Sequence, residues 1–367
     1  MAKTGVTSKA AVLFEYGKPL QIVELPIPKI GPGAILVKVE MAGICGTDVH
    51  LQRGDLTIKP PVPILPGHET IGKIVELGEG RTRDCAGEPL KVGDRIMWAH
   101  EDCGECYFCT VVRMPVLCER RSGYGFGPPE LLRGGFSEYE YIGPKTMVVK
   151  VPEELSGEEA IGVGCAFRSV MAGFERLGGV HVGERVVVQG AGPIGLYSLL
   201  LAAEGGASRV IVVGAPRKRL ELAKRWGASE VVDIDEVKDP GKRKEIVLSL
   251  TEGRGPEVVV EASGVAEAIN EGLEMVQKGG RYLVLGQSSF AKVQIMPSLI
   301  TSKNLTIIGS ISATIAHFYK ALQFLKAKRG KYPLGEIVTK RYRLEEINEA
   351  LDRMALGEEI KPVIDFR

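Results

Sequence analysis

The sequence predicts an α/β protein with two parts, a mainly β domain and a doubly wound parallel sheet. The first observation is an alternation of short apolar runs with helix-like runs through the middle of the chain, a pattern typical of parallel strands joined by crossover helices. The second is that residues 1–150 are rich in Gly, Pro and Val and contain short strand-like runs. With 367 residues, 44% of them hydrophobic, the chain can bury a large core and is expected to divide into two domains.

The β-rich part is expected at both ends of the chain. Residues 34–44 and 70–78 are rich in β-branched and small residues and predict strands. Residues 342–366 predict an amphipathic helix followed by a short strand, which we expect to pack back on the N-terminal part. We therefore assign residues 1–166 and 311–367 to this domain.

The parallel sheet is expected in residues 167–310. Residues 185–213 have the pattern of a β-branched strand, a glycine turn, a helix and a second strand. Further strands are predicted at residues 229–234, 256–264 and 281–287, with helices at residues 217–228 and 265–280.

The glycine turn in this segment has the spacing of a dinucleotide-binding loop. Gly190, Gly192 and Gly195 form G-x-G-x-x-G between a strand and a helix, the context that this motif requires. The first glycine permits the tight turn, the second allows the pyrophosphate to approach, and the third allows close helix packing. The N–H groups at the start of the helix then face the phosphates. The alternative is a glycine turn that binds no ligand.

The charge balance disfavours polyanionic partners. The chain has 47 basic and 46 acidic residues, so no overall field attracts nucleic acid or an anionic membrane. The N-terminal segment lacks the apolar core of a signal peptide, and no run approaches the roughly 20 apolar residues of a transmembrane helix. We expect a cytoplasmic protein with a small-molecule partner.

Four of the seven cysteines lie within sixteen residues, at Cys103, Cys106, Cys109 and Cys118. Cytosolic thiols are kept reduced, so such a cluster indicates metal more often than disulfides. Four thiolates at these spacings can form a closed tetrahedral zinc site, which would be structural. Two disulfide bridges are the alternative.

The remaining cysteines follow another pattern. Cys45 in "GICGTDVH" and Cys165 in "GCAF" flank "PGHET", which contains His68 followed by Glu69. Two cysteines and one histidine would leave a fourth zinc position open, as in catalytic sites. The alternative is that each cysteine is a small core residue. Cys85 lies in a polar stretch and is interpreted as a bystander.

Together these motifs give a resemblance that covers essentially the whole chain. "GICGTDVH", "PGHE", the four-cysteine lobe, "GCAF", "GAGPIG" and "KPVI" occur in the order typical of zinc-dependent medium-chain alcohol dehydrogenases, which the chain resembles. The resemblance implies a Rossmann domain beside a catalytic β domain that carries a structural zinc lobe. It also implies interconversion of an alcohol and an aldehyde or ketone by hydride transfer to or from NAD(P), and a homodimer or homotetramer.

The resemblance also implies roles for single residues. Cys45, His68 and Cys165 match ligands of a catalytic zinc, and the lobe cysteines match ligands of a second, structural zinc, giving two Zn²⁺ per chain. Thr47 and His50 match a proton relay, and Asp48 and Glu69 match carboxylates near the catalytic metal. The implied cofactor-binding residues are Gly190, Gly192, Pro193, Ile194, Gly195, Gly214, Arg217, Arg219, Ser169, Ser263 and Lys361, with Lys361 approaching the cofactor phosphates.

The sequence departs from the family pattern in three places. The loop between Cys109 and Cys118 is one residue longer than the commonest spacing, and Gly46 stands where some members have a phosphate-binding Arg. Gly214 ends the second Rossmann strand where NAD-preferring members have an acidic residue, and Arg217, Lys218 and Arg219 follow it. Without the acid and with these cations, a 2′-phosphate is favoured, so we expect a preference for NADP, with dual use as the alternative.

Other functions remain open on this scaffold. A zinc-free quinone oxidoreductase relative would lack the catalytic trio, whereas a lyase or epimerase using the cofactor transiently, or a non-catalytic nucleotide sensor, would not be distinguished by sequence. Trp98 and Phe126 are candidates for the substrate pocket, although core or loop packing is the simpler interpretation. His100, His181 and His317 match no family role.

Overall fold

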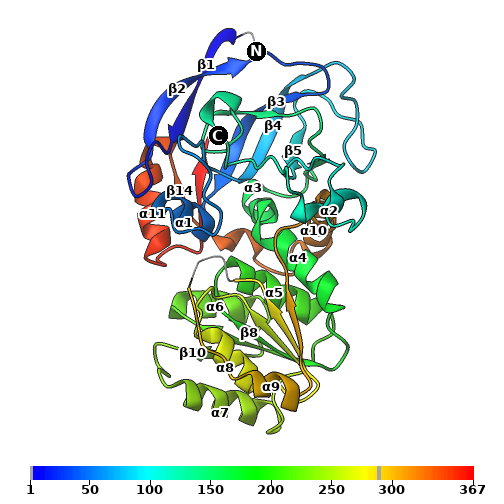
Figure 1. The fold of residues 1–367 in the computed structure, drawn as a ribbon, viewed down its shortest axis with the longest axis vertical. Helices are drawn as coiled ribbons and strands as arrows, with labels where there is room; N and C mark the ends of the chain where they lie inside the picture. Colours follow the sequence, from blue (N-terminus) through cyan, green and yellow to red (C-terminus); the bar gives the residue numbers. More distant parts are fainter. Residues whose placement is uncertain (1–2, 287–290) are drawn as a thin grey trace. The chain divides into compact units, whose positions relative to one another are not determined.

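The computed structural model describes residues 3–286 and 291–367, and the chain divides into two compact units (Figure 1). Unit 1 comprises the residues up to Arg168 together with Ala313–Arg329 and Leu334–Arg367. Unit 2 comprises Ser169–Ser312 and Gly330–Pro333. The boundary falls inside helix α4 (Ala166–Leu177), two residues beyond the position expected from the sequence.

Unit 1 is built around a seven-stranded sheet of order β14-β15-β3-β4-β5-β7, with β6 also paired to β3. A separate antiparallel pair, β1 and β2, completes its strands. The predicted strands at 34–44 and 70–78 are confirmed as β3 and β4. The strands are β1 (Lys3–Val12), β2 (Gln21–Pro28), β3 (Ile35–Gly43), β4 (Glu69–Leu77), β5 (Arg95–Trp98), β6 (Tyr139–Ile142), β7 (Val148–Lys150), β14 (Val338–Tyr342) and β15 (Lys361–Asp365).

The C-terminal segment packs on unit 1, as the sequence predicted. Strand β15 pairs with β3 on one side and β14 on the other, and α11 packs against both β15 and α1 (Figure 1). The apolar faces of α1 and α11 contribute to one buried cluster with strand residues such as Val39 and Ile364. The helices of this unit are α1 (Gly46–Arg53), α2 (Tyr107–Thr110), α3 (Gly157–Ala160), α10 (Ile315–Lys328) and α11 (Ile347–Ala355), with 3-10 helices at Pro115–Leu117, Pro129–Leu131, Ile161–Gly164, Leu334–Ile337 and Leu344–Glu346.

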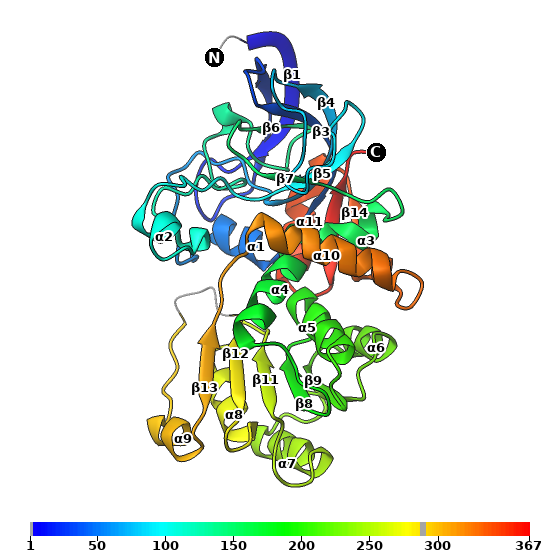
Figure 2. The same cartoon turned by 90° about the vertical axis from the view of Figure 1, so that its right-hand side faces the viewer.

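Unit 2 is a doubly wound parallel sheet of order β10-β9-β8-β11-β12-β13 (Figure 2). This order reverses between β8 and β11, so the carboxyl ends of these two strands flank the point where nucleotides bind in such sheets. The elements are β8 (Arg185–Gln189), α5 (Pro193–Glu204), β9 (Arg209–Gly214), α6 (Arg217–Arg225), β10 (Glu230–Asp233), α7 (Pro240–Leu250), β11 (Val258–Glu261), α8 (Ala268–Met275), β12 (Arg281–Val284), α9 (Pro297–Ser302) and β13 (Thr306–Gly309).

The predicted strands and helices of the parallel sheet are confirmed, with shorter bounds at several ends. The strand predicted at 281–287 is β12, which ends at Val284, and residue 287 lies outside the described residues. β8, β9 and β11 are rich in buried β-branched residues, as expected for strands covered on both faces.

Candidate functional site

Unit 1 brings together Cys45, His68, Glu69 and Cys165, whose ligand atoms all lie within 4.8 Å of one another. Cys45 is the N-cap of α1, where its sulfur accepts a hydrogen bond from the backbone N–H of Thr47 at 3.3 Å. A helix N-terminus favours the thiolate form. The hydrogen bond with Cys165 contributes most to holding the pKa of Cys45 well below its ordinary value.

The imidazole of His68 is oriented by the carboxylate of Asp48, which lies in α1. Asp48 accepts from the backbone N–H of Cys45 at 3.0 Å, completing a capping box, and its other oxygen lies 3.1 Å from Nδ1 of His68. With Nδ1 engaged, Nε2 faces the sulfur of Cys45 at 3.3 Å. Such carboxylate–histidine pairs set the ring orientation of metal-bound histidines.

Glu69 and Lys361 form an ion pair that is fully buried beside this cluster. Nζ of Lys361 lies 2.8 Å from each carboxylate oxygen of Glu69, and neither side chain is exposed. Burial raises the pKa of Glu69 to about 7, although the positive charge of Lys361 acts to lower it. The role of Lys361 at the cofactor phosphates stays a prediction, and in this structure its ammonium group is buried and engaged with both oxygens of Glu69.

The sequence reasoning missed three residues that shape this cluster. A Cβ atom at Gly43 would lie 2.7 Å from Oε2 of Glu69, and one at Gly164 would lie 2.9 Å from its Cα, so both positions leave room for Glu69. Arg168 is buried, donates to the carbonyl of Gly164 at 2.7 Å, and carries a positive charge near the thiols and Glu69. An arginine three residues after Cys165 in an apolar stretch was the available signal.

Thr47 and His50 lie three residues apart on α1, so they share one side of the helix. Within the residues that the structure describes, no hydrogen bond joins the side chains of Thr47 and His50. Nδ1 of His50 instead lies 2.8 Å from Oδ1 of Asp55, whose position follows from the left-handed C-cap at Gly54. Asp55 is a further residue that the sequence analysis did not identify. Gly54, which ends α1, could have indicated that the chain turns back toward His50 at this point.

The four lobe cysteines form a second cluster, again with all sulfur atoms within 4.8 Å of one another. Sulfur–sulfur distances are 3.5 Å for Cys106 and Cys109 and 3.9 Å for Cys106 and Cys118. Zinc–sulfur bonds of about 2.3 Å in a tetrahedron place sulfur atoms about 3.8 Å apart, so the cluster fits zinc. The disulfide alternative is wrong, because all seven cysteines are free.

The glycine turn of unit 2 has the close approaches that its motif requires. Gly190 has φ of +113°, and a Cβ atom there would lie 2.8 Å from the backbone N of Ser263. At Gly195 a Cβ atom would lie 1.9 Å from the carbonyl oxygen of Gly190, which excludes any larger residue. At Gly192 the nearest heavy atom would be Nη1 of Arg219 at 3.9 Å, so this glycine leaves space at the start of α5. Pro193 and Ile194 form the first turn of that helix.

The other residues expected at the cofactor lie at the carboxyl ends of the strands or near the start of α4. Gly214 ends β9, and Ser263, which follows β11, donates through Oγ to Glu261 at 2.7 Å. Arg217 is exposed and pairs with Glu236 at 2.5 Å, whereas Arg219 lies beside Gly192. Ser169 lies in α4.

The two aromatic candidates for the substrate pocket differ in position. Trp98 is buried in a core cluster and packs on Tyr124. Phe126 packs against the ring of His68, with centroids 5.6 Å apart, so only Phe126 touches the metal-ligand cluster.

The remaining histidines have structural or exposed positions. Nδ1 of His100 accepts from the backbone of Tyr124 at 3.0 Å, His181 is exposed, and His317 contacts Thr314 at the start of α10. Among the described residues, no helix combines the length and the apolar character needed to cross a lipid bilayer.

Comparison with protein families identifies both units. Residues 31–153 match the alcohol dehydrogenase GroES-like domain, and residues 193–327 match the zinc-binding dehydrogenase family. The chain is 35% identical over 360 residues to 5-exo-hydroxycamphor dehydrogenase of Pseudomonas putida, covering 98% of each protein.

Solved structures of dehydrogenases share the fold of this chain. An alcohol dehydrogenase of Thermotoga maritima is 34% identical, with a TM-score of 0.91 over 98% of this chain and 100% of that one. A zinc-binding dehydrogenase of Sinorhizobium meliloti bound to NADP is 28% identical, with a TM-score of 0.84 over 98% and 99%. The chain therefore belongs to the zinc-dependent medium-chain alcohol dehydrogenases. It is an oxidoreductase that interconverts alcohols and carbonyl compounds with a nicotinamide cofactor.

Proposed function

We propose that Cys45, His68 and Cys165 hold a catalytic zinc and that the four lobe cysteines hold a structural one. The observation that carries the assignment is the clustering of two thiols and an oriented imidazole, supplied by three distant segments, within 4.8 Å. Three protein ligands leave a position for substrate, whereas four close the lobe site. A bound zinc would supply Lewis-acid polarisation of the reacting oxygen, and the cofactor would accept or donate the hydride.

The surrounding side chains have separate tasks in this proposal. Asp48 fixes the orientation of His68, and Lys361 keeps Glu69 beside the ligands in a defined position. Thr47, whose backbone already contacts Cys45, is proposed to accept the hydroxyl proton of the substrate while releasing its own hydroxyl proton toward His50, which passes a proton to water. The partly exposed imidazole of His50 suits this role.

Replacing His68 by Ala tests the catalytic assignment. We expect turnover to be lost together with one of two zinc ions, while cofactor still binds, because the glycine turn lies elsewhere in the chain. Zinc content, cofactor titration and turnover are measured on the same preparation. The Cys85→Ala variant, at an exposed and isolated cysteine, is the control. Full turnover by verified zinc-free enzyme would contradict the assignment.

For the cofactor we propose NADP preference. Gly214 carries no carboxylate to bind a ribose 2′-OH, and the guanidinium of Arg219 lies beside the phosphate-binding turn. The opposing observation is that Arg217 pairs with Glu236. Arg219 is the stronger candidate for a 2′-phosphate because its guanidinium lies next to Gly192 of the turn.

The cofactor proposal is tested with Gly214→Asp, measuring catalytic efficiency with NAD and NADP. A Cβ atom at this position would lie 3.0 Å from the backbone N of Ala191, so Gly214→Ala is needed to separate crowding from charge. We expect the aspartate, and not the alanine, to lower the NADP preference at least about tenfold. Wild-type enzyme favouring NAD by about tenfold or more, about 1.4 kcal/mol, would overturn the proposal.

The substrate and the oligomeric state are proposed at the level of class. Relatives are named for 5-exo-hydroxycamphor, L-threonine and D-arabinitol, so a screen of secondary alcohols that includes these three, with both cofactors, is the first assay. Cofactor-linked turnover that requires zinc separates a dehydrogenase from a lyase, an epimerase or a nucleotide sensor. A homodimer or homotetramer is supported by the edge strand β13, which exposes Ile307, and light scattering tests it.

A further inference from the structure

Three cations lie side by side across three strands of unit 1. The register pairs Lys38 of β3 with Lys73 of β4, and Lys73 with Arg95 of β5. Residues directly opposite one another on antiparallel strands project from the same face with Cβ atoms about 5 Å apart, and like charges in this arrangement are destabilising. Mutual repulsion within the row of Lys38, Lys73 and Arg95 therefore makes the sheet less stable than neutral residues at these positions would.

Only one of the three cations is neutralised. Arg95 donates through Nε and Nη2 to the carboxylate of Glu40, at 2.7 and 3.0 Å, and through Nη1 to the carbonyl of Leu155 at 2.7 Å. Within the described part of the chain, neither Lys38 nor Lys73 has an acidic partner, and both side chains are exposed. Their two ammonium groups are the uncompensated charges of the row.

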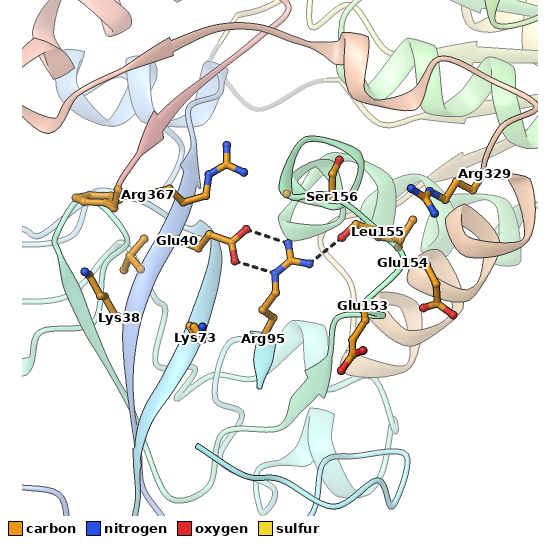
Figure 3. A pocket seen from close by; sticks show the side chains of 13 residues that line it. Lys38, Glu40, Lys73, Arg95, Glu153, Glu154, Leu155, Ser156, Arg329 and Arg367 are labelled. Carbon is orange, nitrogen blue, oxygen red and sulfur yellow. Dashed lines mark hydrogen bonds and ion pairs between the residues drawn. The ribbon is translucent and has the colours of Figure 1, made fainter. Parts of the chain in front are cut away.

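The row lines a pocket with a volume of about 620 Å³ (Figure 3). This is within the range of sites that hold small molecules, roughly 300–1,000 Å³. Figure 3 shows the two lysines on the strand side of the pocket, next to the Glu40–Arg95 pair. The other lining residues are Val39, Glu153, Glu154, Leu155, Ser156, Gly157, Arg329, Phe366 and Arg367.

Acidic residues restrict where an anion could lie in this pocket. Glu40 is neutralised by Arg95, and Glu154 pairs with Lys326 at 2.7 Å, which leaves Glu153 as the lining carboxylate that has no cationic partner among the described residues. The negative charge of a ligand would therefore lie on the lysine side of the pocket.

We propose that this pocket binds a small multivalent anion bearing phosphate or carboxylate groups, held by Lys38 and Lys73. Lysine ammonium groups act as compact charges with three donors each, so they can bind either phosphate or carboxylate groups. A bound anion would offset the repulsion within the row. The site is separate from the metal-ligand cluster, because Lys73 lies four residues, about 13 Å, along β4 from Glu69. The proposal is independent of the function proposed above.

Calorimetric titration of the zinc-loaded enzyme tests the proposal, with nicotinamide cofactor present at saturation so that the dinucleotide site cannot take up the probe. Pyrophosphate and citrate are titrated into wild type, Lys38→Gln/Lys73→Gln and the control Lys18→Gln/Lys145→Gln, which removes two exposed lysines of unit 1 outside the pocket. We expect wild type and control to bind one equivalent, and the pocket variant to bind at least about tenfold more weakly.

Thermal unfolding gives a second measurement that a misfolded variant could not imitate. Without anion, the pocket variant should melt at a higher temperature than wild type, because the repulsion is gone. Added anion should raise the melting temperature of wild type and control more than that of the variant. Binding of pyrophosphate alone indicates a phosphate ligand, and binding of citrate alone indicates a carboxylate ligand. No binding of either anion to wild type, or equal binding by the pocket variant, would overturn the proposal.

Discussion

Replacing Lys361 by Met measures what the buried ion pair with Glu69 contributes. Methionine has a similar length and no charge, so the change removes the ammonium group while largely filling its space. Both side chains are fully buried, and both oxygens of Glu69 accept from Lys361 at 2.8 Å. The variant therefore leaves a buried carboxylate without its cation, which typically costs about 3–5 kcal/mol.

This cost translates into a large shift of the melting temperature. Unit 1 has 219 residues, and for domains of this size about 1 kcal/mol corresponds to about 2–4 °C. Lys361→Met is thus expected to lower the unfolding transition of the zinc-loaded enzyme by about 6–20 °C. Differential scanning calorimetry measures the transition, and Lys145→Met, at an exposed position, is the matched control.

A double variant separates charge from packing. In Lys361→Met/Glu69→Gln both partners are neutral, so much of the loss should be recovered, because replacing a whole buried pair is far less costly than breaking it. A single variant that melts within about 3 °C of wild type, or a double variant no more stable than the single one, would refute the reasoning.

Three further variants test other parts of the molecule. Cys106→Ser should remove one of two zinc ions and lower the melting temperature while turnover at 25 °C persists, and undiminished zinc in metal analysis would contradict the structural site. His50→Gln should slow alcohol oxidation by about 10²-fold near pH 7 and less near pH 10, where hydroxide accepts the proton, whereas an unchanged pH profile excludes the relay. Burial raises the pKa of Glu140 well above its ordinary 4.5. Above about pH 4.5 the folded state therefore keeps a proton that the unfolded state releases, so the contribution of Glu140 to stability falls as pH rises. Glu140→Gln should therefore raise the melting temperature more at pH 8 than at pH 5, and a pH-independent difference would show that the carboxyl is not protonated in the folded protein.

The sequence by itself determined the features that depend on neighbours along the chain. The turn from Gly190 to Gly195 and the cluster from Cys103 to Cys118 each lie within a short segment, so spacing and backbone sterics already limit their geometry. Alternating strands and helices predicted the parallel sheet in the same way, because periodicity along one element reports which face it buries. The proposed catalytic zinc ligands were assigned through resemblance, since Cys45, His68 and Cys165 come from segments up to 120 residues apart.

Only the tertiary structure decided which distant charges meet. Lys361 pairs with Glu69, 292 residues away, because β15 lies beside β3, which in turn pairs with β4, and no sequence pattern predicted this pair. The row of Lys38, Lys73 and Arg95 exists because of strand register, and a shift of one residue would send each side chain to the other face. Burial and charge pairing are properties of the packed chain, so no local pattern carries them.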